Sequence, residues 1–226
     1  MKVPAWSFSA LNNFETCPKQ FFHYRVAKDV KEPENTNNLW GQRFHAAADR
    51  FIKSGTLDPE FAQYKDYFAT YVARIAPGVT VRGEQQLAIG RDLKPCAWFD
   101  KSTWSRSILD VMILDKNTET ADVHDHKTGK IREDSGQLKQ FALTVFIHHP
   151  WVNRVNTHYE WIQHLGKPEQ TSSETFYRED IMDIWDFLLP KLDRFVNAFK
   201  TEAFPARPSG LCKRYCAVST CTHCGV

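Results

Sequence analysis

The sequence lacks the long apolar runs of a membrane protein. No apolar stretch approaches the roughly 18–20 residues that a membrane-spanning helix needs, and the first residues lack the apolar core of a signal peptide. Internal repeats and low-complexity segments are also absent. These absences argue against a membrane or secreted protein, and we expect a soluble, intracellular one.

An excess of charge of either sign is missing as well. The chain holds 29 Lys and Arg against 27 Asp and Glu, so its formal net charge is +2. This balance neither requires nor excludes a polyanionic partner, because local charge matters more than the total, and basic residues outnumber acidic ones after Phe187. At 226 residues the chain is long enough for a sizeable core, and we expect one domain, 1–226.

A hairpin is predicted near the middle of the chain. Residues 108–114 are apolar and β-branched, residues 115–119 have the composition of a turn, and residues 121–128 return as a second strand. Each strand carries a carboxylate where an apolar residue is expected, Asp110 in the first and Asp125 in the second. The two acids are therefore candidate functional residues.

The spacing of Asp125 and Lys127 indicates where their side chains point. Side chains alternate across a strand, so residues two apart share a face, and Asp110 can reach that face from the paired strand. Carboxylates that hold a divalent cation, with a lysine beside them, are what metal-assisted hydrolysis of a phosphodiester requires. An isolated Asp-x-Lys is more often a solvated surface pair, so the embedded Asp110 and the motifs at both chain ends favour a site.

Hydrophobic periodicity predicts the elements around this hairpin. Apolar residues recur every three or four positions in the predicted helices and alternate in the predicted strands. The helices are a short one through Leu11 and Phe14, then residues 38–55, 58–78, 135–149 and 180–204, and the further strands are 79–91, 152–165 and 174–177. The last helix should kink or divide at Pro190.

Three further polar residues lie where they could join such a site. His45 borders the apolar stripe of its helix, a position typical of a surface residue that also suits a ligand facing a cleft. Glu84 lies inside a half-exposed predicted strand, where a single glutamate carries little information alone. Gln137 is in the first turn of its helix, near the end of the strand that carries Asp125 and Lys127.

Four of the six cysteines, Cys212, Cys216, Cys221 and Cys224, fall within 13 residues near the C-terminus. So short a segment has little core of its own, and clustered cysteines without a secretory signal are typical of a metal site rather than of disulfides. Two centres fit. The four thiolates could hold one Zn²⁺, or three of them could join Cys17 around a 4Fe–4S cluster that ties the chain ends together.

In their order and spacing, these motifs resemble the PD-(D/E)XK nucleases of the RecB-like exonuclease group. That group includes the nuclease domains of bacterial recombination helicases, the CRISPR-associated RecB-like exonucleases and many phage exonucleases. The resemblance covers nearly the whole chain, although each motif alone is degenerate. The residues that carry it are Ser9–Pro18, Gly41–His45, Asp110, Asp125–Lys130, Gln137 and the terminal cysteines.

The resemblance implies an α/β fold with a restriction-endonuclease-like core. A mixed central sheet, roughly residues 79–128 and 152–177, would be flanked by helices. The helical part would cover about 38–76, the catalytic α/β core about 79–178, and the C-terminal helix with the cysteine tail about 180–226. A cysteine-ligated metal centre would join the N- and C-terminal segments.

The family also implies a role for each matching residue. Lys127 would position or activate the attacking water, and Gln137 would orient the scissile phosphate or the DNA end. The ligands of Mg²⁺ or Mn²⁺ would be His45, Asp110, Asp125, the carbonyl group of His126 and, as the additional acid of some members, Glu84. The ligands of a 4Fe–4S cluster would be Cys17, Cys212, Cys216 and Cys221, which leaves Cys224 surplus and keeps zinc open as the alternative.

Two positions depart from the family pattern. Ser107 stands where a glycine often precedes the metal aspartate by three residues, and Phe141 stands where a tyrosine often follows the glutamine by four. The serine should be tolerated. The missing hydroxyl group should weaken contacts to phosphate.

The activity implied is metal-dependent hydrolysis of DNA, most often from an end, in DNA processing, recombination or repair. The partners would be DNA with a free end or a single strand and a recombination protein, in the cytoplasm, or in the host's cytoplasm if a phage encodes the chain. A non-catalytic nucleic-acid-binding adaptor is the main rival, and an RNA or structure-specific endonuclease is a further one. The adaptor is disfavoured because both acids and the lysine are present.

Overall fold

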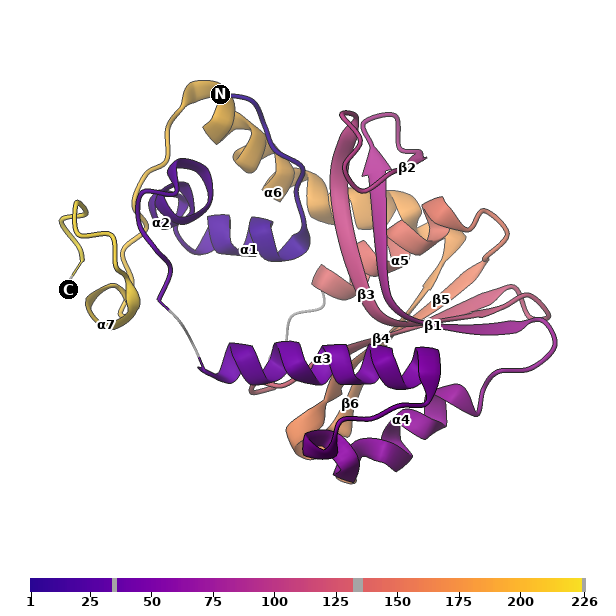
Figure 1. Cartoon of the computed structure of the whole chain (residues 1–226). Coiled ribbons are helices and arrows are strands. Elements are labelled where there is room, and N and C mark those ends of the chain that lie inside the picture. Colours follow the sequence, from indigo (N-terminus) through magenta and orange to yellow (C-terminus); the bar gives the residue numbers. More distant parts are fainter. Residues whose placement is uncertain (34–35, 132–135, 225–226) are drawn as a thin grey trace. The chain divides into compact units, whose positions relative to one another are not determined.

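The computed structural model describes residues 1–33, 36–131 and 136–224 (Figure 1). The chain divides into two compact units. Thr36–Ile184 forms the first, here called the sheet unit, and Met1–Asn35 with Trp185–Val226 forms the second, here called the end unit. That residues 1–226 form one domain stays a prediction. Among the described residues, no helix is both long and apolar enough to cross a membrane.

The sheet unit is built on one six-stranded sheet with the order β2-β1-β3-β4-β5-β6. β4 and β5 are parallel, and the other neighbours are antiparallel, so the predicted mixed sheet is confirmed. The strands are β1 (Val79–Gly90), β2 (Pro95–Cys96), β3 (Thr103–Asp115), β4 (Thr120–Lys127), β5 (Arg154–Trp161) and β6 (Thr171–Tyr177). The α-helices are α3 (Thr36–Ser54), α4 (Lys65–Val72) and α5 (Gly136–His148), and 3₁₀ turns lie at Pro59–Tyr64, Ile162–His164, Pro168–Gln170 and Arg178–Asp180.

The predicted hairpin is formed by β3 and β4. Their ladder runs from Asp115 opposite Thr120 to Val111 opposite His124. β3 begins at Thr103, five residues before the predicted start of the strand, because it also pairs with β1, and that pairing starts at Thr103.

Helices cover both faces of the sheet (Figure 1). On one face, α3 and α4 supply Phe44 and Phe68 to a buried core that also contains Val111 and Ile113 of β3. On the other face lies α5, which is buried on nearly all sides. Burial of each such large apolar side chain contributes about 1.5–3 kcal/mol. The sheet is thereby held rigidly between two helical layers.

Three predicted elements differ from the structure. The helix predicted at 58–78 is a 3₁₀ turn followed by α4, which ends at Val72, five residues before Pro77. The strand predicted at 152–165 ends at Trp161 and continues as a 3₁₀ turn. α6 (Ile181–Thr201) is not divided at Pro190. Burial of its apolar stripe on both sides of the proline compensates for the lost hydrogen bond.

The end unit brings the two chain ends together. It contains α1 (Phe8–Thr16), α2 (Pro18–Phe21), a π-helix at Phe22–Ala27, α6 from Trp185 onward, and α7 (Cys212–Tyr215). Ser7 caps α1 by accepting a hydrogen bond from the backbone N–H of Ala10. Aromatic rings from both ends then pack against one another, namely Phe14, Phe21, Phe195, Phe199 and Phe204. An apolar core therefore joins the ends.

Candidate metal and catalytic site

Asp110 lies at the point where β3 and β4 separate. Their ladder stops at Val111 and His124, and the Asp110 carboxylate accepts a hydrogen bond of 2.7 Å from the backbone N–H of His126. The side chain thus takes the place of the next ladder bond. This bond fixes one carboxylate oxygen between the two strands.

A distortion of β1 accompanies the orientation of Asp110. Asp110 and Val111 are neighbours, yet Asp110 contacts α3 through His45 while Val111 packs in the core beneath the same helix. A regular strand would point them to opposite faces. Glu84, which falls opposite Asp110 in the β1–β3 register, has a φ of 40° and interrupts the ladder there.

His45 is brought to Asp110 by the close approach of α3 to β4. Its Nδ1 lies 3.0 Å from Oδ1 of Asp110. Gly41, one turn earlier in α3, is buried, and a Cβ atom at this position would lie 2.9 Å from Oγ1 of Thr128. The absence of a side chain at Gly41 therefore permits the helix to approach the end of β4.

His126 completes a group of three possible ligands. One ligand atom from each of His45, Asp110 and His126 lies within 4.8 Å of the others, and among the described residues this is the only such group. The resemblance implied the backbone carbonyl of His126, whereas here the imidazole is the group that faces Asp110. Its Nε2 lies 3.3 Å from the Tyr71 hydroxyl, which in turn lies 2.6 Å from that of Tyr67.

Asp125, Lys127 and Gln137 form a second, closed set of contacts. Nζ of Lys127 lies 2.5 Å from an Asp125 oxygen and donates a hydrogen bond of 2.7 Å to Oε1 of Gln137. Nε2 of Gln137 donates to the other Asp125 oxygen at 3.2 Å. The side chains of the β4 pair share a face, as alternation predicts, and the first turn of α5 places the glutamine over them.

The two carboxylates have different electrostatic surroundings. Burial raises the pKa of Asp125 to about 6, with Lys127 opposing this shift and the charge of Asp110 adding to it. Burial also acts to raise the pKa of Asp110, but the hydrogen bond and charge of His45 outweigh it and lower that pKa. Burial lowers the pKa of His126 to about 4, so its imidazole is neutral and has a lone pair to offer a cation.

Glu84 is the predicted site residue that does not join either set. Its side chain is exposed, and it is outside the group of three ligands. Asp49, four residues after His45 on α3, was missed by the sequence analysis. A Cβ atom on Gly83 would lie only 2.4 Å from one of its oxygens, and this oxygen is buried without a hydrogen-bond partner among the described residues. The helical spacing from His45 was the signal that could have identified it.

The departures from the family pattern lie on the α5 side of the sheet. Ser107 is buried, and its hydroxyl lies 3.0 Å from that of Thr144. Phe141 is buried in the core. A serine is therefore accommodated at position 107 by a polar partner on α5.

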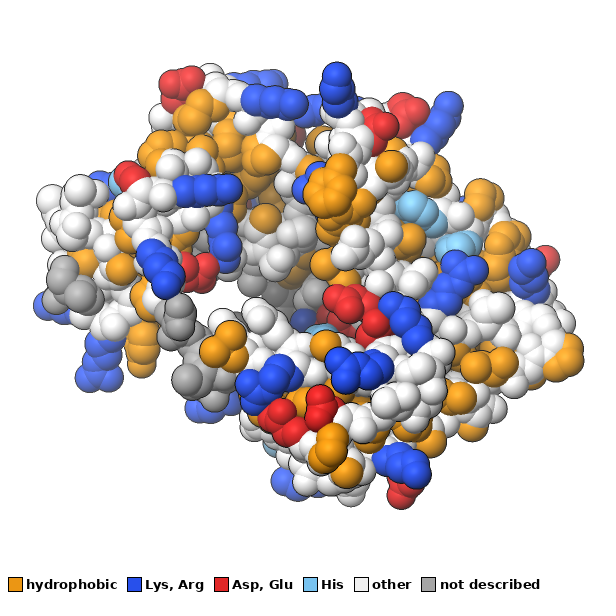
Figure 2. All heavy atoms as spheres, viewed as in Figure 1, with side chains coloured by type: hydrophobic (Ala, Val, Ile, Leu, Met, Phe, Trp, Pro, Cys, Tyr) orange, Lys and Arg blue, Asp and Glu red, His pale blue; other side chains and the backbone are white. Residues whose placement is uncertain are grey.

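Acidic side chains gather on the visible face of the sheet unit, between α3 and β3, with basic side chains beside them (Figure 2). This mixture differs from a uniformly acidic patch.

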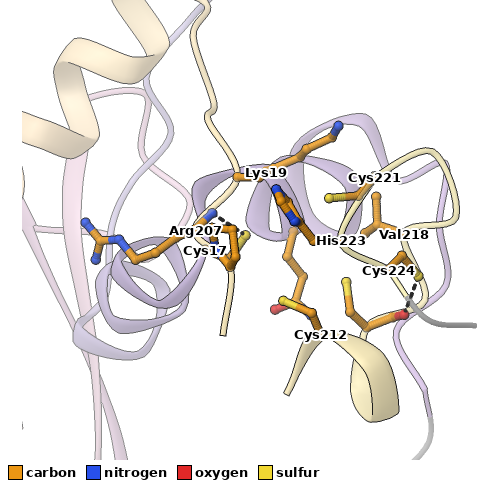
Figure 3. Close-up of a pocket in the computed structure, with 12 residues that line it drawn as sticks. Cys17, Lys19, Arg207, Cys212, Val218, Cys221, His223 and Cys224 are labelled. Carbon is orange, nitrogen blue, oxygen red and sulfur yellow. Dashed lines mark hydrogen bonds between the residues drawn. The ribbon is translucent and has the colours of Figure 1, made fainter. Parts of the chain in front are cut away.

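The cysteines line a small cavity in the end unit (Figure 3). Its lining includes His223, which the sequence analysis missed, and the five cysteines Cys17, Cys212, Cys216, Cys221 and Cys224. Backbone N–H groups donate to two of the sulfurs, from Arg207 to Cys17 at 3.4 Å and from Ser209 to Cys212 at 3.3 Å. No three of these donors, in the part of the chain that the structure describes, lie within 4.8 Å of one another.

One protein-family model matches part of the chain. A family model described as the PD-(D/E)XK nuclease superfamily matches residues 5–108, which make up less than half of the chain. The matched segment contains His45 and ends before Asp110. No curated protein matches the sequence.

Two solved structures are similar to the chain. One is the crystal structure of a "putative exonuclease" from Eubacterium rectale, with 11% identity and a TM-score of 0.49, covering 90% of this chain and 84% of that one. The other is the crystal structure of SSO0001, with 10% identity and a TM-score of 0.43, covering 100% of this chain and 89% of that one. At these values neither similarity bears on activity.

Proposed function

We propose that this chain acts as a PD-(D/E)XK nuclease that hydrolyses phosphodiester bonds of DNA with a divalent cation. The observation that carries the proposal is the convergence of two sets of side chains where β3 and β4 separate. His45, Asp110 and His126 offer ligand atoms within 4.8 Å of one another. Asp125 and Lys127 stand beside them on β4, where a carboxylate and an ammonium group are in contact.

A divalent cation fits this donor set. Carboxylate oxygens suit Mg²⁺ and Mn²⁺, and neutral imidazoles suit transition metals. Nδ1 of His126 is buried without a hydrogen-bond partner among the described residues, as is expected of a nitrogen that binds a metal ion. His45, Asp110 and Asp125 would hold the cation with His126, and Glu84 could add a contact from its exposed position. The imidazoles favour Mn²⁺ over Mg²⁺.

The remaining side chains serve the reaction. A bound cation supplies an activated water and offsets charge on the phosphate. Lys127, held by Asp125 and Gln137, would keep its ammonium group directed at the attacking water or the phosphate. Gln137 would exchange its contact with Lys127 for one to the scissile phosphate when DNA binds.

Membership of the RecB-like exonuclease group is part of the proposal. It rests on the motifs of the sequence, and it implies attack from a free or single-stranded DNA end in recombination or repair, inside the cell, with a recombination protein as partner. The structure-specific endonuclease and the non-catalytic adaptor are the competing functions.

The same resemblance leads us to propose a 4Fe–4S cluster on Cys17, Cys212, Cys216 and Cys221. Its support is that Cys17 lines the same cavity as the tail cysteines, although it lies 195 residues before Cys212. A Zn²⁺ on the tail thiols, Cys224 included, would not need Cys17. The backbone N–H group directed at Cys212 suits a thiolate in either centre, whereas the one directed at Cys17 suits a thiolate of the cluster.

A cleavage assay tests the proposed function. Single- and double-stranded DNA, labelled at one end or internally, would be incubated with the protein in Mn²⁺, Mg²⁺ or EDTA. The exonuclease predicts mononucleotides or short products from ends, more with Mn²⁺, and none in EDTA. Cleavage of a closed circle would decide for an endonuclease. Binding without cleavage in either metal would decide for the adaptor.

A further inference from the structure

The first half of β3 forms a ribbon that extends beyond the rest of the sheet (Figure 1). β3 pairs with β4 only from Val111 onward, whereas its residues from Thr103 to Leu109 pair with β1. β2 adds to the outer edge of β1 at the same end. Residues 91–106 form the end of this ribbon and are here called the ribbon tip.

Phe99 is held at the ribbon tip with most of its ring in water. It is 85% exposed, more than any other large apolar side chain among the described residues. The Arg106 guanidinium lies 5.5 Å from the centre of its ring and 5.4 Å from that of Trp98. Nε of Arg106 also donates a hydrogen bond to the backbone carbonyl of Trp98 at 2.9 Å.

The loop that carries Phe99 is ordered by its own hydrogen bonds. The backbone N–H of Asp100 donates to the carbonyl of Ala97 at 3.0 Å, and that of Thr103 donates to the carbonyl of Asp100 at 3.1 Å. Single exposed apolar side chains are ordinary on protein surfaces. This ring differs, because a fixed loop and a stacked cation hold one of its faces toward solvent.

The ribbon tip also presents positive charge. Arg91, Lys94 and Lys101 are exposed, and none of them forms an ion pair with any described residue. The two acids of the tip, Asp92 and Asp100, accept hydrogen bonds from the backbone of their own turns. Exposed aromatic rings among free basic side chains are the combination that binds single-stranded nucleic acid, because bases stack and phosphates are attracted.

One face of β3 connects the ribbon tip with the candidate site. Side chains alternate, so Arg106, Ile108 and Asp110 share a face, whereas Ser105 and Ser107 are buried against α5. Ile108 is 42% exposed. At a rise of about 3.3 Å per residue, Arg106 and Asp110 are about 13 Å apart along the strand.

We propose that the ribbon tip binds an unpaired nucleotide of a DNA strand. The base stacks on the exposed face of Phe99, and Arg106 with Lys101 offsets the charge of the adjoining phosphates. The strand then follows the exposed face of β3 toward Asp110. The direction toward Asp110 rests on the proposed nuclease function, whereas the binding itself requires no hydrolysis.

The test measures binding of the full-length protein to a labelled thymidine oligonucleotide in EDTA by fluorescence anisotropy. Phe99→Ala should weaken binding at least about tenfold, while Phe99→Tyr keeps the ring and the affinity. Blunt duplex of equal length should bind both variants equally. Met182→Ala, at a position 67% exposed elsewhere in the sheet unit, is the matched control and should bind like the unaltered chain.

The salt dependence of the affinity separates the contribution of stacking on Phe99 from that of the basic side chains. Lys101→Ala should lower the slope of log affinity against log salt concentration by about 0.7, the value for one phosphate contact on a single strand, and Phe99→Ala should leave that slope unchanged. Because Phe99 is largely exposed, its removal should not alter the melting temperature.

The binding proposal is overturned if the unaltered chain does not bind the single strand, or if Phe99→Ala binds it equally well. Binding that depends on Phe99 supports it even if no DNA is cleaved in Mn²⁺ or Mg²⁺. That second result would overturn the proposed nuclease function alone, so the two failures are distinguishable.

Discussion

The histidine–aspartate site and the cysteine cavity differ in how far the folded chain assembles their donors. At the first, His45 is within 3.0 Å of Asp110, and His126 is close enough to complete a group of three. At the second, five thiols line a small cavity without three of them converging, as far as the described residues extend.

The elements that carry the donors explain this difference. Asp110, Asp125 and His126 lie on neighbouring strands whose ladder fixes their positions, and α3 supplies His45 from a rigid surface. As far as it is described, the tail that carries four cysteines has only one helix of four residues, and little of it is buried. Secondary structure therefore organises the first set of donors in advance. The proposed cluster would have to supply the order of the second set.

The largest effect should follow from the two charged residues of β4. Asp125→Asn and Lys127→Ala should each reduce cleavage by about 10²–10³-fold or more, because a preorganised charge at the reacting phosphate is lost. Gel assays in Mn²⁺ measure the rate, and Lys116→Ala, an exposed lysine in the β3–β4 turn, is the control. If Asp125→Asn cleaves DNA as fast as the unaltered chain, Asp125 takes no part in the reaction, and the ordered donors of the sheet unit are not the active site.

Loss of Cys17 tests the role of the cysteine cavity. A cluster that uses Cys17 should colour the anaerobically purified protein, and Cys17→Ala should bleach it and cost about 2–5 kcal/mol of unfolding free energy, as loss of a native cross-link does. Visible absorbance and thermal melting measure both effects.

Two cysteines provide controls for this experiment. Cys96 lies in β2, outside the cavity, and Cys224 is surplus to the proposed cluster. Their alanine variants should keep both the colour and the stability. A colourless protein with one bound Zn²⁺, unaffected by Cys17→Ala, would contradict the cluster and confine the metal to the tail.

A smaller effect is expected at His45. His45→Ala should weaken Mn²⁺ binding about 10- to 100-fold and narrow the preference for Mn²⁺ over Mg²⁺, because a nitrogen ligand or its support is lost. Isothermal titration calorimetry measures both affinities. His164→Ala removes a partly exposed histidine paired with Glu169 and should change neither affinity. Unchanged Mn²⁺ affinity in His45→Ala would make His45 a structural neighbour of Asp110.

The smallest effect concerns the approach of α3 to β4. Gly41→Ala places a methyl group 2.9 Å from Oγ1 of Thr128, and overpacking of this kind costs about 1–3 kcal/mol, partly offset by about 1 kcal/mol of helix propensity. Thermal melting and Mn²⁺ affinity should both decline. Adding Thr128→Ala should restore them, because it removes the contacting oxygen. Without such recovery, the close approach would not be what positions His45.

Local patterning predicted the elements of the sheet unit because their periodicity is set within each segment. The hairpin around Asp110 and Asp125, the helix that bears His45 and the first turn that bears Gln137 all follow from alternation, apolar spacing and turn composition. The same local rules failed where packing against neighbouring elements decides where a helix ends. They extended the helix at 58–78 too far, and they allowed a division of α6 at Pro190 that does not occur.

The sequence by itself determined which chemical groups are available and, through the strand period, that Asp125 and Lys127 share a face. The tertiary structure decided what surrounds them. The distorted register at Glu84 and the close approach permitted by Gly41 bring Asp110 and His45 together, and the imidazole of His126 joins them. These contacts cross between elements, so their geometry depends on how helices and strands pack, and no spacing within one segment encodes it.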